Sequence, residues 1–304
     1  DDNIGEAILK LKELKEIGEV QNIWHCHLVN KKGQYIGSVG LEELIIFPHN
    51  AIFADIPTEK LRDFNVTHKD DIKDVIEVVT NYNLTSIPVI DDKKRLIGRI
   101  TSDDIYDIIE QNATEQIYNM AGVNEEAEQE ESIVEIGKSR AFWLGINLIT
   151  AIVASLVIGI FDTTIQSLVA LAVLMPIVAS MGGNAGTQTL TVTVRQMALG
   201  DIENSDAKKT IYKEVVISLA NGLIFALVMG TIAFLWFDMP LLGVVIALSM
   251  VVNLLGAGFF GAVIPMGLQK ANIDPAIGST VLLTTVTDVV GFFSFLGLAT
   301  LILL

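Results

Sequence analysis

Five long apolar segments in the second half of the sequence constrain the fold of this chain more than any other feature. They cover residues 141–161, 166–194, 211–237, 241–268 and 276–304. Roughly 20 apolar residues cross a bilayer core as a helix. Hydrocarbon offers the backbone no hydrogen-bond partner, so only helices and closed barrels span it. The sequence therefore predicts an all-α transmembrane domain of five helices over residues 141–304.

The first 140 residues have the opposite character. They carry 28 of the 36 acidic side chains and 15 of the 20 basic ones, which indicates an acidic part outside the bilayer. Such a surface argues against nucleic acid as a partner and suits cations. The single cysteine, Cys26, excludes an internal disulfide and fits a reducing compartment.

Basic residues fall on alternate sides of the five segments. They precede the first segment, or lie between the second and third or the fourth and fifth: Lys138, Arg140, Arg195, Lys208, Lys209, Lys213 and Lys270. The two remaining loops contain no lysine or arginine. By the positive-inside rule we expect a multi-pass protein of the cell (inner) membrane, with the acidic part cytoplasmic and Leu304 outside.

The acidic part contains an internal repeat. IGSVGLEEL (36–44) aligns with IGRITSDDI (97–105) at an offset of 61, and each copy follows a strand–turn–strand–helix order. This pattern predicts an α+β fold in which two copies pack face to face.

Residues 1–120 resemble a tandem CBS pair whose first copy lacks its opening strand. Residues 97–104 are similar to the ribose motif of that family. The resemblance implies a site for ATP or another adenine nucleotide in the second copy, formed by Thr101, Asp104 and Pro88. The alternative is that Thr101 or Ser102 merely caps the following helix. The first copy has Gly40 at the position of Thr101 and so departs from the motif.

Asp288 is the one charged residue of the last apolar segment and lies near its middle. A lone carboxylate at that depth costs several kcal/mol unless it meets a cavity, a partner or a cation. A protonated aspartate that joins two helices is one explanation. A cation site in a pore, with Thr284, Thr285 and Thr287 as further oxygen ligands, is the explanation we prefer.

The second segment carries polar and small residues at membrane depth. Asn184 and Gln188 are four residues apart and share one helix face, with Thr191 nearby. A glycine-mediated helix contact would explain the pattern, but together with Asp288 it favours an oxygen-lined path. The isolated Asn147 and Asn253, in other segments, predict hydrogen bonds between helices.

Three motifs make the chain similar to the MgtE family of magnesium channels. They are Pro176 followed by GGNAGTQ (182–188), TTVTDVVG (284–291) and NIDPA (272–276). The resemblance implies a homodimer with a central pore, in which Asp288 is the pore carboxylate and Gly183, Asn184 and Thr187 provide outer oxygen ligands for Mg²⁺. It implies a cytoplasmic-mouth carboxylate at Asp274 and a connecting, or plug, helix over residues 121–140. Members usually begin with an additional acidic helical domain, so we expect a truncated or short form.

The resemblance also implies gating by cytosolic Mg²⁺, which bridges acidic surfaces and holds the pore shut. Four acidic residues match sensor positions: Asp71, Asp104, Asp107 and Glu115. Lys73, Asn83 and Asn112 stand where some members carry carboxylates, which predicts a weaker or rearranged gate.

Together these features predict a Mg²⁺-selective channel or transporter for Mg²⁺ uptake, with Mg²⁺ as substrate and regulator and with membrane lipid and a second copy of the chain as partners. The alternative is a CBS-regulated secondary transporter of another divalent cation or a small solute, for which we find no inverted repeat. A membrane metalloprotease would need a zinc-binding H-E-x-x-H, and residues 141–304 contain no histidine. We therefore expect no enzymatic activity.

Overall fold

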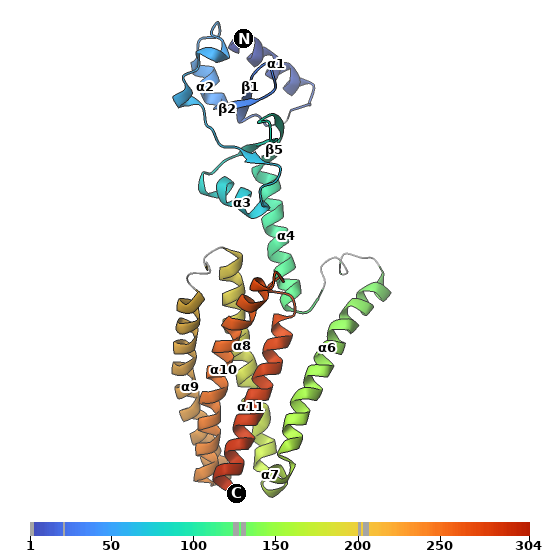
Figure 1. Cartoon of the computed structure of the whole chain (residues 1–304), viewed down its shortest axis with the longest axis vertical. Coiled ribbons are helices and arrows are strands. Elements are labelled where there is room, and N and C mark those ends of the chain that lie inside the picture. Colours follow the sequence, from blue (N-terminus) through green and yellow to red (C-terminus); the bar gives the residue numbers. More distant parts are fainter. Residues whose placement is uncertain (1–2, 21, 124–127, 129–131, 200–201, 203–206) are drawn as a thin grey trace. The chain divides into compact units, whose positions relative to one another are not determined.

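The computed structural model describes residues 3–20, 22–123, 128, 132–199, 202 and 207–304 (Figure 1). The chain divides into two compact units, Asp1–Asn112 and Ala113–Leu304. The first is an α+β unit and the second is helical, which confirms the predicted fold class.

Two β-hairpins, each followed by a helix, form the repeat in the first unit. The first consists of β1 (His25–Val29) and β2 (Tyr35–Gly40), followed by α2 (Leu41–Ile46). The second consists of β4 (Ser86–Ile90) and β5 (Leu96–Thr101), followed by α4 (Ser102–Met120). Strand bounds and helix starts differ by 61 throughout, and both hairpins shift register at the equivalent step, Leu28/Val29 and Val89/Ile90. The internal repeat is confirmed.

The other elements of this unit differ between the copies. They are α1 (Ile4–Glu16), two 3₁₀ turns (Phe53–Asp55 and Thr58–Lys60), β3 (Val66–Thr67) and α3 (Ile72–Asn81). β3 pairs in parallel with β4 to complete a three-stranded sheet, whereas the described residues show only β1 and β2 in the other sheet.

Each copy has its own apolar core. Leu44 and Ile105 occupy equivalent positions, and both are buried beneath their hairpins. Leu44 packs with Ile4 and Val39, while Ile105 packs with residues of α3 and β4. The repeat in sequence therefore becomes a repeat in packing.

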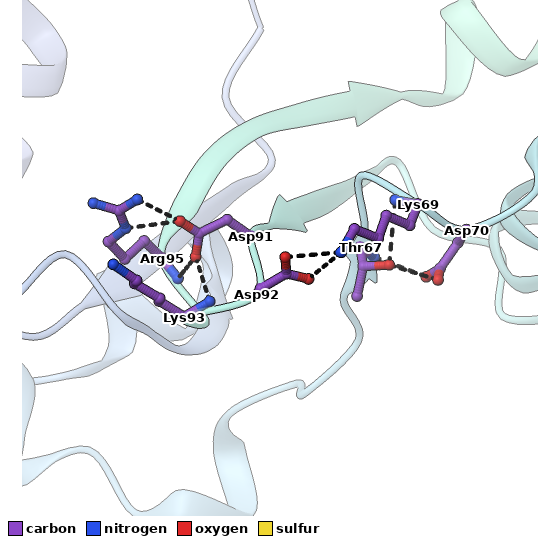
Figure 2. Close-up of polar contacts among 7 residues, drawn as sticks. All are labelled: Thr67, Lys69, Asp70, Asp91, Asp92, Lys93 and Arg95. Carbon is purple, nitrogen blue, oxygen red and sulfur yellow. Dashed lines mark hydrogen bonds and ion pairs between the residues drawn. The ribbon is translucent and has the colours of Figure 1, made fainter.

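Carboxylates fix the turn between β4 and β5, as Figure 2 shows. Asp91 accepts hydrogen bonds from the backbone N–H of Lys93 (2.9 Å) and Arg95 (2.8 Å) and from the Arg95 guanidinium (2.7 Å). These bonds favour the charged form and lower the pKa of Asp91. Lys69 bonds to both oxygens of Asp92, which ties the loop before α3 to this turn.

In the described part of the second unit, five helices are long and apolar enough to span a membrane, as predicted. They are α6 (Ile133–Ile160), α8 (Ala170–Ala198), α9 (Ala207–Phe237), α10 (Pro240–Lys270) and α11 (Ser279–Leu303). A short helix, α7 (Asp162–Ser167), follows the first span. Residues 133–140 of the predicted connecting segment are continuous with α6, and residues 124–127 and 129–131 of that segment lie outside the described residues.

α10 is the central helix of the bundle and packs against α8, α9 and α11. Glycines bring the backbones close. A Cβ at Gly258 would overlap the Ser218 side chain of α9, and one at Gly261 would lie 2.9 Å from the Gly186 carbonyl oxygen of α8. α6 differs, because its main contacts are with α11 and Ala154 is its one buried residue among those described.

Asn253 joins three helices at the middle of the bundle. Its side chain is fully buried, and Nδ2 donates to the Val178 carbonyl of α8 at 2.7 Å. Cβ atoms at Gly182 of α8 and Gly291 of α11 would lie 2.4 and 2.9 Å from that nitrogen. The predicted interhelical bond of Asn253 is confirmed. Asn147 instead donates to the Trp143 carbonyl of its own helix, so its predicted interhelical bond is wrong.

We expect Gly182→Ala to destabilise the bundle, because the new methyl group displaces Asn253 from its bond to Val178. Overpacking of this kind costs roughly 1–3 kcal/mol. The matched control is Gly183→Ala, because no atom lies within 4 Å of a Cβ there. Thermal unfolding in detergent measures both variants, and equal melting temperatures would contradict this account of Asn253.

Candidate ion path and regulatory contacts

α8 presents two faces of different character. Gly182 and Gly186 are buried against α10 and α11, whereas Asn184 and Thr187 are exposed and Gly183 is partly exposed. Among the described residues, these exposed polar groups bond only within their own helix: Thr187 donates to the Gly183 carbonyl (2.8 Å) and Asn184 to Ser180 Oγ (3.3 Å). Gln188 and Thr191 extend the same exposed face. A polar stripe at membrane depth is therefore uncovered in the single chain.

Asp288 lies on α11 at the depth of this stripe. α11 packs on α8 where Leu283 meets Gly186, and Gly182 and Gly291 meet at Asn253. Asp288 is three residues from Gly291, which is about 4.5 Å along the helix. The carboxylate is half-buried, and it has no hydrogen bond or ion pair among the described residues. The structure thus brings Asp288 to the level of Gly183.

The threonines beside Asp288 are already hydrogen-bonded. Thr284 and Thr285 donate to the Val281 carbonyl, and Thr287 donates to that of Thr284. Their oxygen lone pairs stay available, because a hydroxyl that donates one bond can still accept others. They can assist an ion site but supply no charge to it.

Asp274 lies where the end of α4 meets the start of α11, within the second unit. Its carboxylate accepts from the Ala276 N–H at 2.8 Å, and Asn119 Nδ2 lies 3.5 Å from its other oxygen. At the start of α11, Thr280 Oγ1 donates to the Met120 carbonyl at 2.7 Å. Asp274 therefore belongs to a contact that ties the last turn of α4 to the helix that carries Asp288.

The predicted sensor carboxylates do not form a metal cluster within the described part of one chain. Asp71 caps α3 by accepting from the Lys73 N–H at 2.9 Å. Asp104 caps α4, while Asp107 and Glu115 are exposed on the same helix. Any ion that these groups share must be completed by residues from elsewhere.

Thr101 and Asp104 contact each other directly. Asp104 Oδ2 accepts from the Thr101 N–H at 3.0 Å and from its hydroxyl, and these bonds lower the pKa of Asp104. Pro88 is the strand partner of Arg99 on the neighbouring strand, two residues before Thr101. Thr67 and Asp70 make the same pair of contacts elsewhere in the unit (Figure 2). The pairing joins Thr101, the last residue of β5, to the first turn of α4, and it places both side chains at the carboxyl end of β5.

Sequence reasoning missed one polar group inside the bundle. Glu214 of α9 is only 7% exposed and accepts a hydrogen bond from Thr189 Oγ1 of α8 at 3.2 Å. The signal was present, because this acidic residue falls inside a predicted span, directly after Lys213.

Comparison of the sequence with known protein families gives two matches. Residues 175–298 match the MgtE profile, described as a divalent cation transporter, and residues 54–111 match the CBS domain. The membrane-spanning half of the chain is thus similar to the MgtE family. The match includes every residue proposed above for the ion path, from Gly183 to Asp288.

The matching relatives are longer than this chain. A magnesium transporter MgtE of Thermus thermophilus is 31% identical over 288 residues, which cover 94% of this chain and 63% of that protein. One of Bacillus subtilis is 28% identical over 303 residues, 98% of this chain and 65% of that protein. A crystal structure of the soluble part of a magnesium transporter is 27% identical and covers 37% of this chain and 43% of that chain, with a TM-score of 0.34.

Proposed function

We propose that this protein is a Mg²⁺ channel or transporter that mediates Mg²⁺ uptake across the cell membrane as a homodimer. The observation that carries the proposal is the uncovered polar stripe of α8 beside Asp288, in a helix bundle similar to the MgtE family. Proteins named magnesium transporters match nearly the whole chain.

The stripe favours a water-filled path that two copies enclose. Polar and charged side chains at membrane depth almost always face a bundle interior or an aqueous cavity, because exposure to lipid is costly. Asn184 and Thr187 have no such cover within one chain, and Asp288 is only half-buried there. A second copy of the same surface would supply it, since a twofold interface brings identical patches together.

Charge balance also supports a dimer. Mg²⁺ releases water reluctantly and is held in proteins through one or two carboxylates with several waters retained. Two Asp288 side chains carry two negative charges, which offset the two positive charges of the ion. The amide of Asn184, the hydroxyl of Thr187 and the carbonyl of Gly183 would then hydrogen-bond the retained waters.

We expect Asp288→Asn to reduce Mg²⁺ flux into proteoliposomes about tenfold or more, because a loss of about 1.4 kcal/mol of ion stabilisation lowers occupancy tenfold. A Mg²⁺-sensitive dye inside the vesicles reports the flux. Asp238→Asn is the matched control, since it removes the same charge from the exposed loop before α10. Normal flux through a dimeric Asp288→Asn protein would place the ion path elsewhere.

The proposal extends to regulation of the transport by cytosolic Mg²⁺. With the acidic unit in the cytoplasm and Leu304 outside, cytosolic Mg²⁺ would bind between acidic surfaces that include Asp71, Asp104, Asp107 and Glu115. The bound ion relieves repulsion between carboxylates. The contact of Asp274 and Thr280 with the end of α4 would then transmit the closed state to α11.

We expect millimolar Mg²⁺ to protect the acidic unit against limited proteolysis in the full-length dimer. Asp107→Asn should shift half-protection to higher Mg²⁺, because this carboxylate is exposed and has no partner among the described residues. Lys73→Asp should shift it to lower Mg²⁺ by restoring a carboxylate. Protection that is the same with and without Mg²⁺ would rule out this gate.

We also propose that the second repeat binds ATP or another adenine nucleotide through Thr101, Asp104 and Pro88. Isothermal titration with ATP tests it. Thr101→Val should weaken binding several-fold, because one hydrogen bond contributes about 1 kcal/mol. Thr67→Val is the control, since it removes the equivalent hydroxyl from the pair with Asp70, outside the motif. Equal affinities for the two variants would show that Thr101 only caps α4.

A further inference from the structure

Glu214 is a buried carboxylate that the ion path does not use. It lies about two turns into α9, and its side chain points into the bundle, where Thr189 is its hydrogen-bond partner. Among the described residues no lysine or arginine forms an ion pair with it, although Lys213 is its neighbour in sequence and is exposed. An unpaired buried carboxylate is costly, and the structure around it offers further oxygen atoms.

Thr193 supplies the second observation. It lies one turn from Thr189 on the same face of α8 and is 0% exposed, yet its Oγ1 has no hydrogen-bond partner among the described residues. Other threonines of the bundle, such as Thr187 and Thr285, donate to the carbonyl four residues before them. A buried hydroxyl without a partner costs about 1–3 kcal/mol, so a ligand that it could contact would stabilise this position.

α10 contributes, beside Thr189, a backbone carbonyl that lacks its usual donor four residues later. Pro265 is buried in α10 and has no N–H, so the Gly261 carbonyl lacks its donor within the helix. The Gly261 backbone lies against Thr189, since a Cβ there would be 2.9 Å from the Thr189 Cβ. Backbone carbonyls freed in this way can coordinate Na⁺ in membrane proteins.

The single negative charge of Glu214 favours a monovalent cation as the ligand. A monovalent cation beside Glu214 gives a neutral group, whereas a divalent cation would leave a net positive charge buried in a medium of low polarity. Carboxylate, hydroxyl and carbonyl oxygens are ligands for small hard cations. We propose that Glu214, Thr189 and Thr193, with the Gly261 carbonyl, form a sodium site between α8, α9 and α10. This site is separate from Asp288 and goes beyond the proposed Mg²⁺ transport.

The test is the thermal unfolding of the purified full chain in Mg²⁺-free detergent buffer, with Na⁺ replacing choline at constant ionic strength and pH. A ligand that binds the folded state raises the melting temperature in a saturable way. We expect such a rise with Na⁺ and a smaller one with K⁺. Glu214→Gln should abolish it, and Thr193→Val should raise the half-saturating Na⁺ concentration about tenfold.

Two controls make the test specific. Thr191→Val removes a hydroxyl from the exposed face of α8, and Asp288→Asn removes the carboxylate of the ion path, so both should keep the Na⁺ response. Thr193→Val retains every charge and carries the test if Glu214→Gln does not fold. An unchanged Na⁺ response in Thr193→Val would overturn the proposal. So would a wild-type protein whose melting temperature does not rise with Na⁺.

Discussion

Close approach of helix backbones at glycine is the constraint on which the membrane half of this protein depends. Lipid tails are as apolar as leucine, so helices in a bilayer gain little from burying apolar surface and associate through tight packing and hydrogen bonds. Gly258 and Gly261 give α10 this contact with α9 and α8, and Gly182 makes room for the Asn253 side chain. These contacts also determine the position of the proposed ion path, because they fix which face of α8 points away from the bundle.

The parts of the fold that follow local patterns could be predicted. The offset of 61 located both hairpins, and apolar length located all five spans. Boundaries set by single residues could not be read in this way. α11 begins at Ser279 because Gly278 adopts a left-handed conformation (φ 67°), whereas residues 276–278 are as apolar as the span itself. β3 has only two residues, and its pairing with β4 decides its existence.

The residues of the candidate sites also fall into two groups, those that a local sequence pattern reveals and those that only tertiary packing reveals. Asp288 and Asn184 could be found because a polar residue inside an apolar run is visible in the sequence. The contact of Asp274 and Thr280 with α4 joins residues about 155 positions apart, and no local pattern encodes it. Glu214 was visible as an acidic residue, but its burial depends on how α8 and α10 pack around it. The sequence thus shows where charged residues lie along the chain, whereas tertiary packing determines what surrounds each of them.

The contacts of α6 have a consequence for how the bundle assembles during synthesis. This helix enters the membrane before the other four spans described, yet its main partner is α11, which is made after them. Until then α6 must remain in lipid without that partner, and native contacts over such a long separation form late. The side chains of α6 are largely apolar, and almost all of them face outward. The helix can therefore stay in the lipid bilayer on its own until α11 packs against it.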